Sequence, residues 1–110
     1  MTRTALTLHR ATRFVDRLCG LHAYPPLADD TGLFLAPCRA VHTFGLRYSI
    51  DVVFLDRHGL AVKQVDSLQP RRIAWCLAAV AAVELPAGYC RARPDYAPAI
   101  RAALDRAGAA

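Results

Sequence analysis

The stretch that decides the fold spans residues 41–56 and reads Val-His-Thr-Phe-Gly-Leu-Arg-Tyr-Ser-Ile-Asp-Val-Val-Phe-Leu-Asp. Its second half is an apolar run, residues 50–55, that ends at the turn signals of residues 56–59. Such a run is typical of a largely buried strand. Asp51 interrupts the run, and a carboxylate is costly to bury unless a partner compensates it. The sequence therefore predicts that Asp51 pairs with Arg47 or with backbone amides and so fixes the position of the strand.

Length and composition limit the class of protein. The chain has 110 residues, of which 55% are hydrophobic and 21% charged, as expected for one globular domain rather than a disordered chain. The longest apolar run, residues 73–83, is too short to cross a bilayer and is closed by Glu84 and Pro86. The first residues carry charge without a following apolar segment, so no signal peptide is expected. We expect a single domain over residues 1–110, located in the cytoplasm.

The formal net charge of +5 comes almost entirely from arginine, since Lys63 is the only lysine. A basic domain can attract nucleic acid or an acidic partner. The arginines are scattered, however, and no aromatic stripe accompanies them, so solvated surface charge is the favoured interpretation. The alternative, a nucleic-acid-binding module, requires four of them to share one face: Arg71, Arg72, Arg91 and Arg93.

Four cysteines are far apart and include no Cys-x-x-Cys pair: Cys19, Cys38, Cys76 and Cys90. In a reducing compartment such cysteines are usually small buried hydrophobic residues. The alternative is a zinc site formed by Cys38 and His42, four residues apart, with Cys76 or Cys90. We favour the first interpretation and expect neither a metal nor a cofactor.

The pattern along the chain predicts an α+β fold that is mainly β. Strands are expected over residues 2–8, 33–35, 41–44, 50–55, 60–65 and 79–85, and helices over 11–19 and 95–107. Pro37 predicts an edge position for strand 33–35, because proline donates no hydrogen bond to a ladder. Glu84 is expected to face outward between Val83 and Leu85, and Trp75 to pack in the core or at its rim. The predicted architecture is an antiparallel, partly closed, barrel-like sheet with a helix near each end.

Three separated motifs resemble the domain of unknown function 192 family of bacteria and archaea. They are residues 37–59 (Pro-Cys-Arg-Ala through Asp-Arg-His-Gly), residues 18–21 (Leu-Cys-Gly-Leu) and residues 83–88 (Val-Glu-Leu-Pro-Ala-Gly), so the similarity covers about residues 10–90. The resemblance implies a compact β-rich fold and no established activity. The family often has methionine and proline where this chain has Leu46 and Ser49. It usually ends in a closing strand with a Gly-Asp pair, which the helix over residues 95–107 replaces here.

The polar residues of this region form the candidate site: His42, Arg47, Asp51 and Glu84. The leading interpretation is a non-catalytic binding or accessory domain, with a shallow polar pocket near His42, Arg47 and Asp51. The pocket would take a polar or anionic ligand, or a peptide segment of a partner protein. The competing interpretation is a small hydrolase in which Asp51 orients His42 as a general base, and it requires both side chains to meet in an open cleft. No residue is assigned as catalytic, because no nucleophile or metal pattern accompanies the pair.

Overall fold

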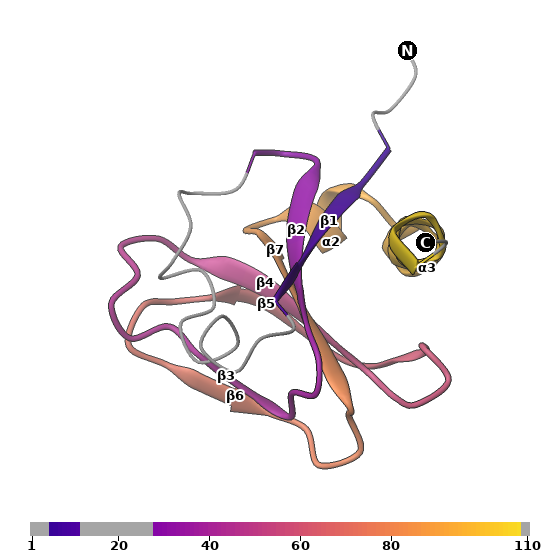
Figure 1. Cartoon of the computed structure of the whole chain (residues 1–110). Helices are drawn as coiled ribbons and strands as arrows, with labels where there is room; N and C mark the ends of the chain where they lie inside the picture. Colours follow the sequence, from indigo (N-terminus) through magenta and orange to yellow (C-terminus); the bar gives the residue numbers. More distant parts are fainter. Residues whose placement is uncertain (1–4, 12–27, 109–110) are drawn as a thin grey trace.

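The computed structural model describes residues 5–11 and 28–108 (Figure 1). The strands are β1 (Thr7–Ala11), β2 (Thr31–Leu35), β3 (Ala40–His42), β4 (Ile50–Leu55), β5 (Ala61–Leu68), β6 (Ile73–Trp75) and β7 (Ala81–Pro86). The helices are α2 (Tyr89–Ala92) and α3 (Tyr96–Gly108). The predicted strands at 50–55, 60–65 and 79–85 and the helix at 95–107 are confirmed within a few residues. Residues 12–19 of the other predicted helix lie outside the described part of the chain.

The described strands form two sheets. The larger has five strands in the order β1-β2-β7-β4-β5, and the smaller pairs β3 with β6. All pairings are antiparallel except that of β1 with β2. The prediction of a mainly β, largely antiparallel fold is therefore confirmed. The partly closed barrel is not, because the larger sheet is mixed and open, with β1 and β5 as its two edges.

Strand β2 occupies an inner position in the larger sheet. It pairs with β1 on one side and β7 on the other, so the predicted edge position is wrong. Pro37 lies two residues beyond the end of β2 and removes no donor from its ladder. After β7 the described chain contains only α2 and α3, so no closing strand follows within that part.

Both faces of the five-stranded sheet are covered. On the face that we call the helix side, Val53 of β4 packs with residues of β1, β7, α2 and α3. On the opposite face, the β3–β6 side, Val52 packs with Val41 of β3 and Ala74 of β6. Figure 1 shows α3 and the β3–β6 pair on different sides of the sheet. Strands β4 and β7 are thus central, and every residue of both is buried except the half-buried Pro86.

Strand β6 is absent from the predicted strands for a local reason. It has three residues, and the alanines that follow it favour helix by propensity. Its strand conformation comes from pairing with β3, where Val41 lies opposite Ala74.

Candidate functional site

Asp51 is fully buried at 0% exposure, on the helix side of β4. Its Oδ1 accepts hydrogen bonds from the backbone N–H of Ser67 (2.9 Å) and of Gly88 (3.1 Å). Its Oδ2 accepts a third from the backbone N–H of Cys90 (3.0 Å). The predicted pairing with backbone amides is therefore confirmed. One carboxylate joins β4 to β5 and to the start of α2, and we call this arrangement the Asp51 clamp.

The backbone around the clamp is shaped to present those N–H groups. Ile50 pairs with Leu68 and Val52 with Val65, so two residues of β5 lie opposite the single Asp51 in a bulge. Ser67, in that bulge, has the unusual positive φ of 50°. Gly88, the residue before α2, has a φ of 84°, a conformation that glycine adopts at no steric cost. The clamp compensates the buried charge and holds both irregular segments in place.

Asp51, Asp66 and Cys90 place ligand atoms within 4.8 Å of one another, a group that could hold a metal ion. Burial, together with the charges of Asp51 and Asp66, raises the pKa of the Cys90 thiol to about 12. Metals bind the thiolate rather than the thiol, and both oxygens of Asp51 already accept backbone hydrogen bonds. These three residues are therefore better suited to stabilise the fold than to bind a metal ion. Within the described residues, Cys38, His42 and Cys76 form no such group.

Glu84 lies inside the protein, at 3% exposure, so the predicted outward position is wrong. The physical reason is that β7 is a central strand, covered on both faces. Glu84 pairs with Val52 and shares the β3–β6 side with it, whereas Asp51 pairs with Leu85 on the helix side. Burial raises the pKa of the Tyr48 phenol, and the charge of Glu84 raises it further.

The other two predicted site residues are exposed. His42 lies on β3, with its ring centroid 5.8 Å from that of Phe44, and Arg47 lies in the turn between β3 and β4. The hydrolase interpretation needs Asp51 in an open cleft beside His42, but Asp51 is enclosed and bound by backbone amides. Asp51 and Glu84 lie on opposite faces of the sheet, so the four residues do not form one pocket. A ligand-binding role for them stays a prediction.

The outer surface of the small sheet was not anticipated as a site. Val41 and Ala74, the middle residues of β3 and β6, are buried, and the residue on either side of each is exposed. Trp75 is 59% exposed, Ile73 54% and Phe44 49%, so of its two expected positions, in the core or at its rim, Trp75 does not take the first. We call this surface the β3–β6 face, and its members are Ala40, His42, Phe44, Ile73 and Trp75. The alternation of Ile73 and Trp75 around Ala74 was the available signal, but three residues are too few to recognise it.

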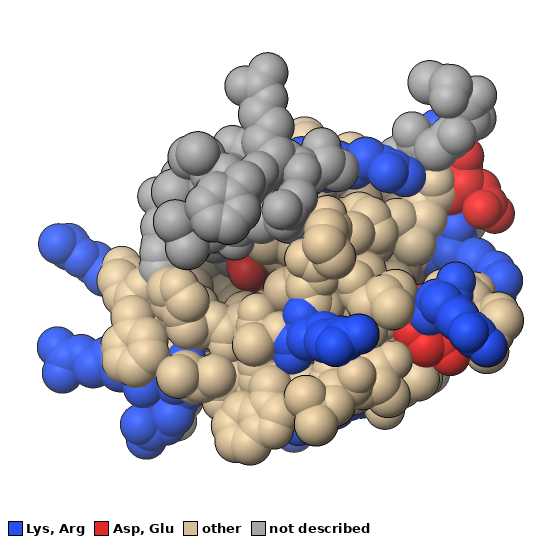
Figure 2. All heavy atoms as spheres, turned by 60° about the horizontal axis from the view of Figure 1, so that its bottom comes forward, with Lys and Arg blue, Asp and Glu red and all other residues tan. Residues whose placement is uncertain are grey.

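The surroundings of the β3–β6 face are basic. Residues 37–50 and 69–83, which contain the two strands, include no aspartate or glutamate. The Lys63 amine donates a hydrogen bond to the Trp75 carbonyl (2.8 Å) and lies 5.8 Å from the centroid of its ring. Figure 2 turns this side forward and shows lysine and arginine groups around and across a tan surface, with most acidic groups toward one edge. The arginines of the two stretches are Arg39, Arg47, Arg71 and Arg72.

Buried Thr43 holds the loop that carries two of these arginines. The Arg72 N–H donates to the Thr43 hydroxyl (2.9 Å), which in turn donates to the Gln69 carbonyl (2.6 Å). The backbones of Thr43 and Arg72 are bonded as well, Thr43 N–H to Arg72 carbonyl at 2.9 Å. Arg71 has a φ of 65°, which is strained for a residue with a side chain and persists where surrounding bonds fix it. The Arg71–Arg72 pair is therefore presented by an ordered loop.

The other arginines of the predicted nucleic-acid set belong elsewhere. Arg91 lies in α2 and Arg93 directly follows it. Helix α2 packs on the helix side of the sheet through Tyr89 and Cys90. The four arginines therefore belong to segments on different sides of the sheet, and only Arg71 and Arg72 adjoin the β3–β6 face.

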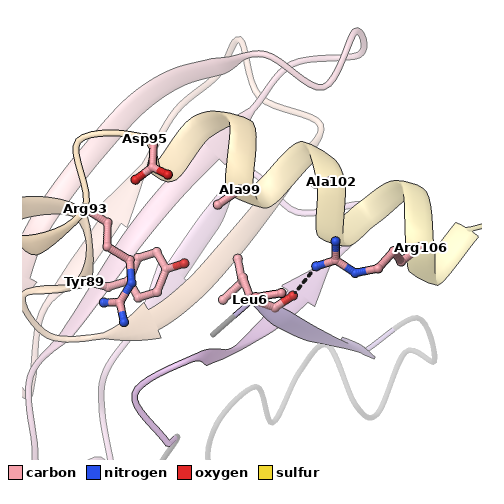
Figure 3. A pocket seen from close by; sticks show the side chains of 8 residues that line it. Leu6, Tyr89, Arg93, Asp95, Ala99, Ala102 and Arg106 are labelled. Carbon is pink, nitrogen blue, oxygen red and sulfur yellow. Dashed lines mark hydrogen bonds between the residues drawn. The ribbon is translucent and has the colours of Figure 1, made fainter. Parts of the chain in front are cut away.

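A hollow of about 170 Å³ lies between the start of β1 and α3 (Figure 3). The Arg93 guanidinium covers the Tyr89 ring at 4.5 Å, and Arg106 donates a hydrogen bond to the Leu6 carbonyl (2.7 Å). Both guanidinium groups thus serve contacts within the protein, and the hollow is a junction between α3 and β1. A second hollow, of about 360 Å³, adjoins the start of β3 and is lined by Pro37, Cys38, Arg39 and Val80.

The fold and the clamp define a small β-sheet domain in which buried Asp51 is bound by backbone amides and an exposed aromatic face is flanked by arginines. This chain belongs to the domain of unknown function 192 family, described as uncharacterized ACR, whose model matches residues 1–94. The match ends two residues before α3. No curated protein is significantly similar to the chain.

Two solved structures share the fold. One is a protein of unknown function from Novosphingobium aromaticivorans, with a TM-score of 0.71 and 14% identity over 79% of this chain and 67% of that one. The other, from Sinorhizobium meliloti, is named as a candidate transcription regulator, with a TM-score of 0.71 and 19% identity over 79% of this chain and 73% of that one. At these identities the similarity establishes the fold alone. In the described residues, no helix has the length and apolar character needed to cross a membrane.

Proposed function

We propose that this chain is a non-catalytic binding module that holds an anionic partner on its β3–β6 face. The observation that carries the proposal is the exposure of Trp75, Ile73 and Phe44 on one small sheet whose flanking segments contain arginines and no acidic residue. Exposed apolar side chains gathered on one surface mark interaction sites more often than isolated ones do. A surrounding field of one sign selects partners of the opposite sign and speeds their encounter.

Each predicted site residue has a place in this proposal. His42 would contact the partner directly, since it belongs to the exposed face, and Arg47 would add to the positive field from the following turn. Asp51 would act indirectly, because the clamp fixes β4, which the small sheet packs against. Glu84 would stay below the face, on the same side of the large sheet.

A hydrolase receives less support. The carboxylate that would orient His42 is enclosed and already accepts three backbone hydrogen bonds. General acid–base catalysis requires a group within hydrogen-bond reach of the substrate. Asp51 is fully buried, so a substrate on the surface could not reach its carboxylate.

The test uses Trp75, the single tryptophan of the chain, as the reporter. We expect heparin and poly-L-glutamate, two model polyanions, to change its fluorescence at low salt, with affinity falling as salt rises because the contacts are ionic. The double variant Arg71→Glu/Arg72→Glu should weaken binding strongly. The control Arg91→Glu/Arg101→Glu changes the net charge equally on other elements and should weaken it much less.

Two outcomes would contradict the proposal. One is the absence of any fluorescence change with either polyanion. The other is an equal loss of affinity in both double variants, since that would assign binding to net charge rather than to the β3–β6 face.

A further inference from the structure

We infer that the anionic partner is a single-stranded nucleic acid, with bases stacking on the aromatic side chains of the β3–β6 face. This inference rests on the proposed function and specifies its partner. Proteins that bind single strands combine aromatic stacking platforms with cations that follow the phosphates. Both parts occur on this surface.

The stacking platform is formed by β3 and β6. Trp75 lies directly opposite Ala40, the smallest member of the face, so no bulky cross-strand neighbour covers the indole from that side. His42 lies opposite Ile73, and its ring is tilted by 39° against that of Phe44. Trp75 and Ile73 are two residues apart, which is about 6.6 Å along a strand. This spacing would place one base on Trp75 and the next beside His42.

Positively charged side chains lie along the path that the sugar-phosphate backbone of a bound single-stranded nucleic acid would take. Arg71 and Arg72 immediately precede Ile73, on the loop that Thr43 holds in place. At the other end, Arg39 precedes Ala40, and its Nε donates to the Ala79 carbonyl (3.1 Å). That bond anchors Arg39 beside the hollow of about 360 Å³, which adjoins the Trp75 end of the face. The Lys63 amine lies over one side of the Trp75 ring, 5.8 Å from its centroid, so a base would stack on the other side.

Single strands fit this surface better than the alternatives. In a duplex the faces of the bases are stacked on one another, so side chains that project from a short sheet have no base to stack on. Helix α3, which could enter a groove, packs on the other side of the large sheet. An acidic peptide could pair with the arginines, but its carboxylates would not stack on the exposed aromatic rings.

The test measures binding of fluorescently labelled oligo(dT) and oligo(U) by anisotropy, against a duplex of the same length and against poly-L-glutamate. We expect the single strands to bind tightest and to quench Trp75. Trp75→Leu, which keeps an apolar side chain, should lower the affinity roughly tenfold, because stacking is lost. Trp75→Phe should retain most of the affinity. The matched control, Leu60→Ala, removes an exposed apolar residue elsewhere (51% exposed) and should change nothing.

Failure of this inference is distinguishable from failure of the proposed function. If poly-L-glutamate binds as well as the oligonucleotides, or if Trp75→Leu binds them like the unmodified protein, the partner is not a stacked single strand. The face would then remain a polyanion-binding surface, provided that Arg71→Glu/Arg72→Glu still weakens poly-L-glutamate binding strongly. If no polyanion binds, both conclusions are wrong.

Discussion

Asp51 illustrates how a single side chain can organise segments that are distant in the sequence. Its carboxylate accepts N–H groups from Ser67, Gly88 and Cys90, which lie on a bulge, before a helix and within that helix. A buried polar group left unsatisfied costs about 1–3 kcal/mol, so the carboxylate stabilises three segments at once.

We expect Asp51→Asn to lower the free energy of unfolding by about 2–4 kcal/mol. The amide oxygen can still accept from Ser67 and Gly88, but its NH₂ group would face the N–H of Cys90, donor against donor. Urea denaturation measures the loss. The control is Asp66→Asn, which changes an exposed carboxylate of the same cluster and should cost less than about 0.5 kcal/mol. Equal losses in the two variants would show that Asp51 is not a clamp.

At the scale of the element, α3 lies beyond the part of the chain that the family model matches, yet it closes one face of the sheet. Ile100 and Ala103 are buried in the cluster formed by β1, β4 and β7. Arg106 adds a hydrogen bond to the Leu6 carbonyl, near the other end of the chain. The helix is therefore part of the core and not an appendage.

Truncating Ile100, a buried side chain of α3, tests whether this helix is part of the core. Ile100→Ala should destabilise the protein by about 3 kcal/mol, since it removes a side chain that is 1% exposed from a packed core. Arg101→Ala, one residue further on the exposed surface, should cost less than about 0.5 kcal/mol. Thermal unfolding monitored by circular dichroism compares them. If Ile100→Ala unfolds like the unmodified protein, α3 does not contribute to the core.

At the scale of the whole molecule, the domain is a five-stranded sheet with helices on one side and the small β3–β6 sheet on the other. The central strands β4 and β7 are buried on both faces, whereas β5 is an edge strand with mostly exposed residues. The β3–β6 face is thus the outer surface of the thinnest layer, built on a well-packed base. This placement lets aromatic residues be exposed without loss of the core.

Hydrogen exchange should reflect this layering. Amides of β4 and β7 should exchange slowest, near the rate set by global unfolding, because opening them requires the core to separate. Amides of β3, β6 and the outer edge of β5 should exchange faster. Mass spectrometry of peptic fragments measures both classes. Protection of β3 and β6 equal to that of β4 would contradict the picture of a thin outer layer.

The sequence by itself determined the elements whose pattern is local: the apolar run of β4, its turn to β5, the apolar β7 and the periodic stripe of α3. It also predicted that Asp51 is paired, because a buried carboxylate without a partner is energetically costly. The resemblance to the family followed from three motifs, each of which is a continuous stretch of the chain.

The tertiary structure alone decided what depends on which segments meet. Pairing with β1 made β2 an inner strand despite Pro37, and two covered faces placed Glu84 inside. The three amides that hold Asp51 come from distant segments, and the exposure of Trp75 follows from a short strand that exists through its pairing with β3. Strand order, and burial where it depends on strand order, are properties of contacts between segments far apart in the chain, and no local pattern of residues encodes them.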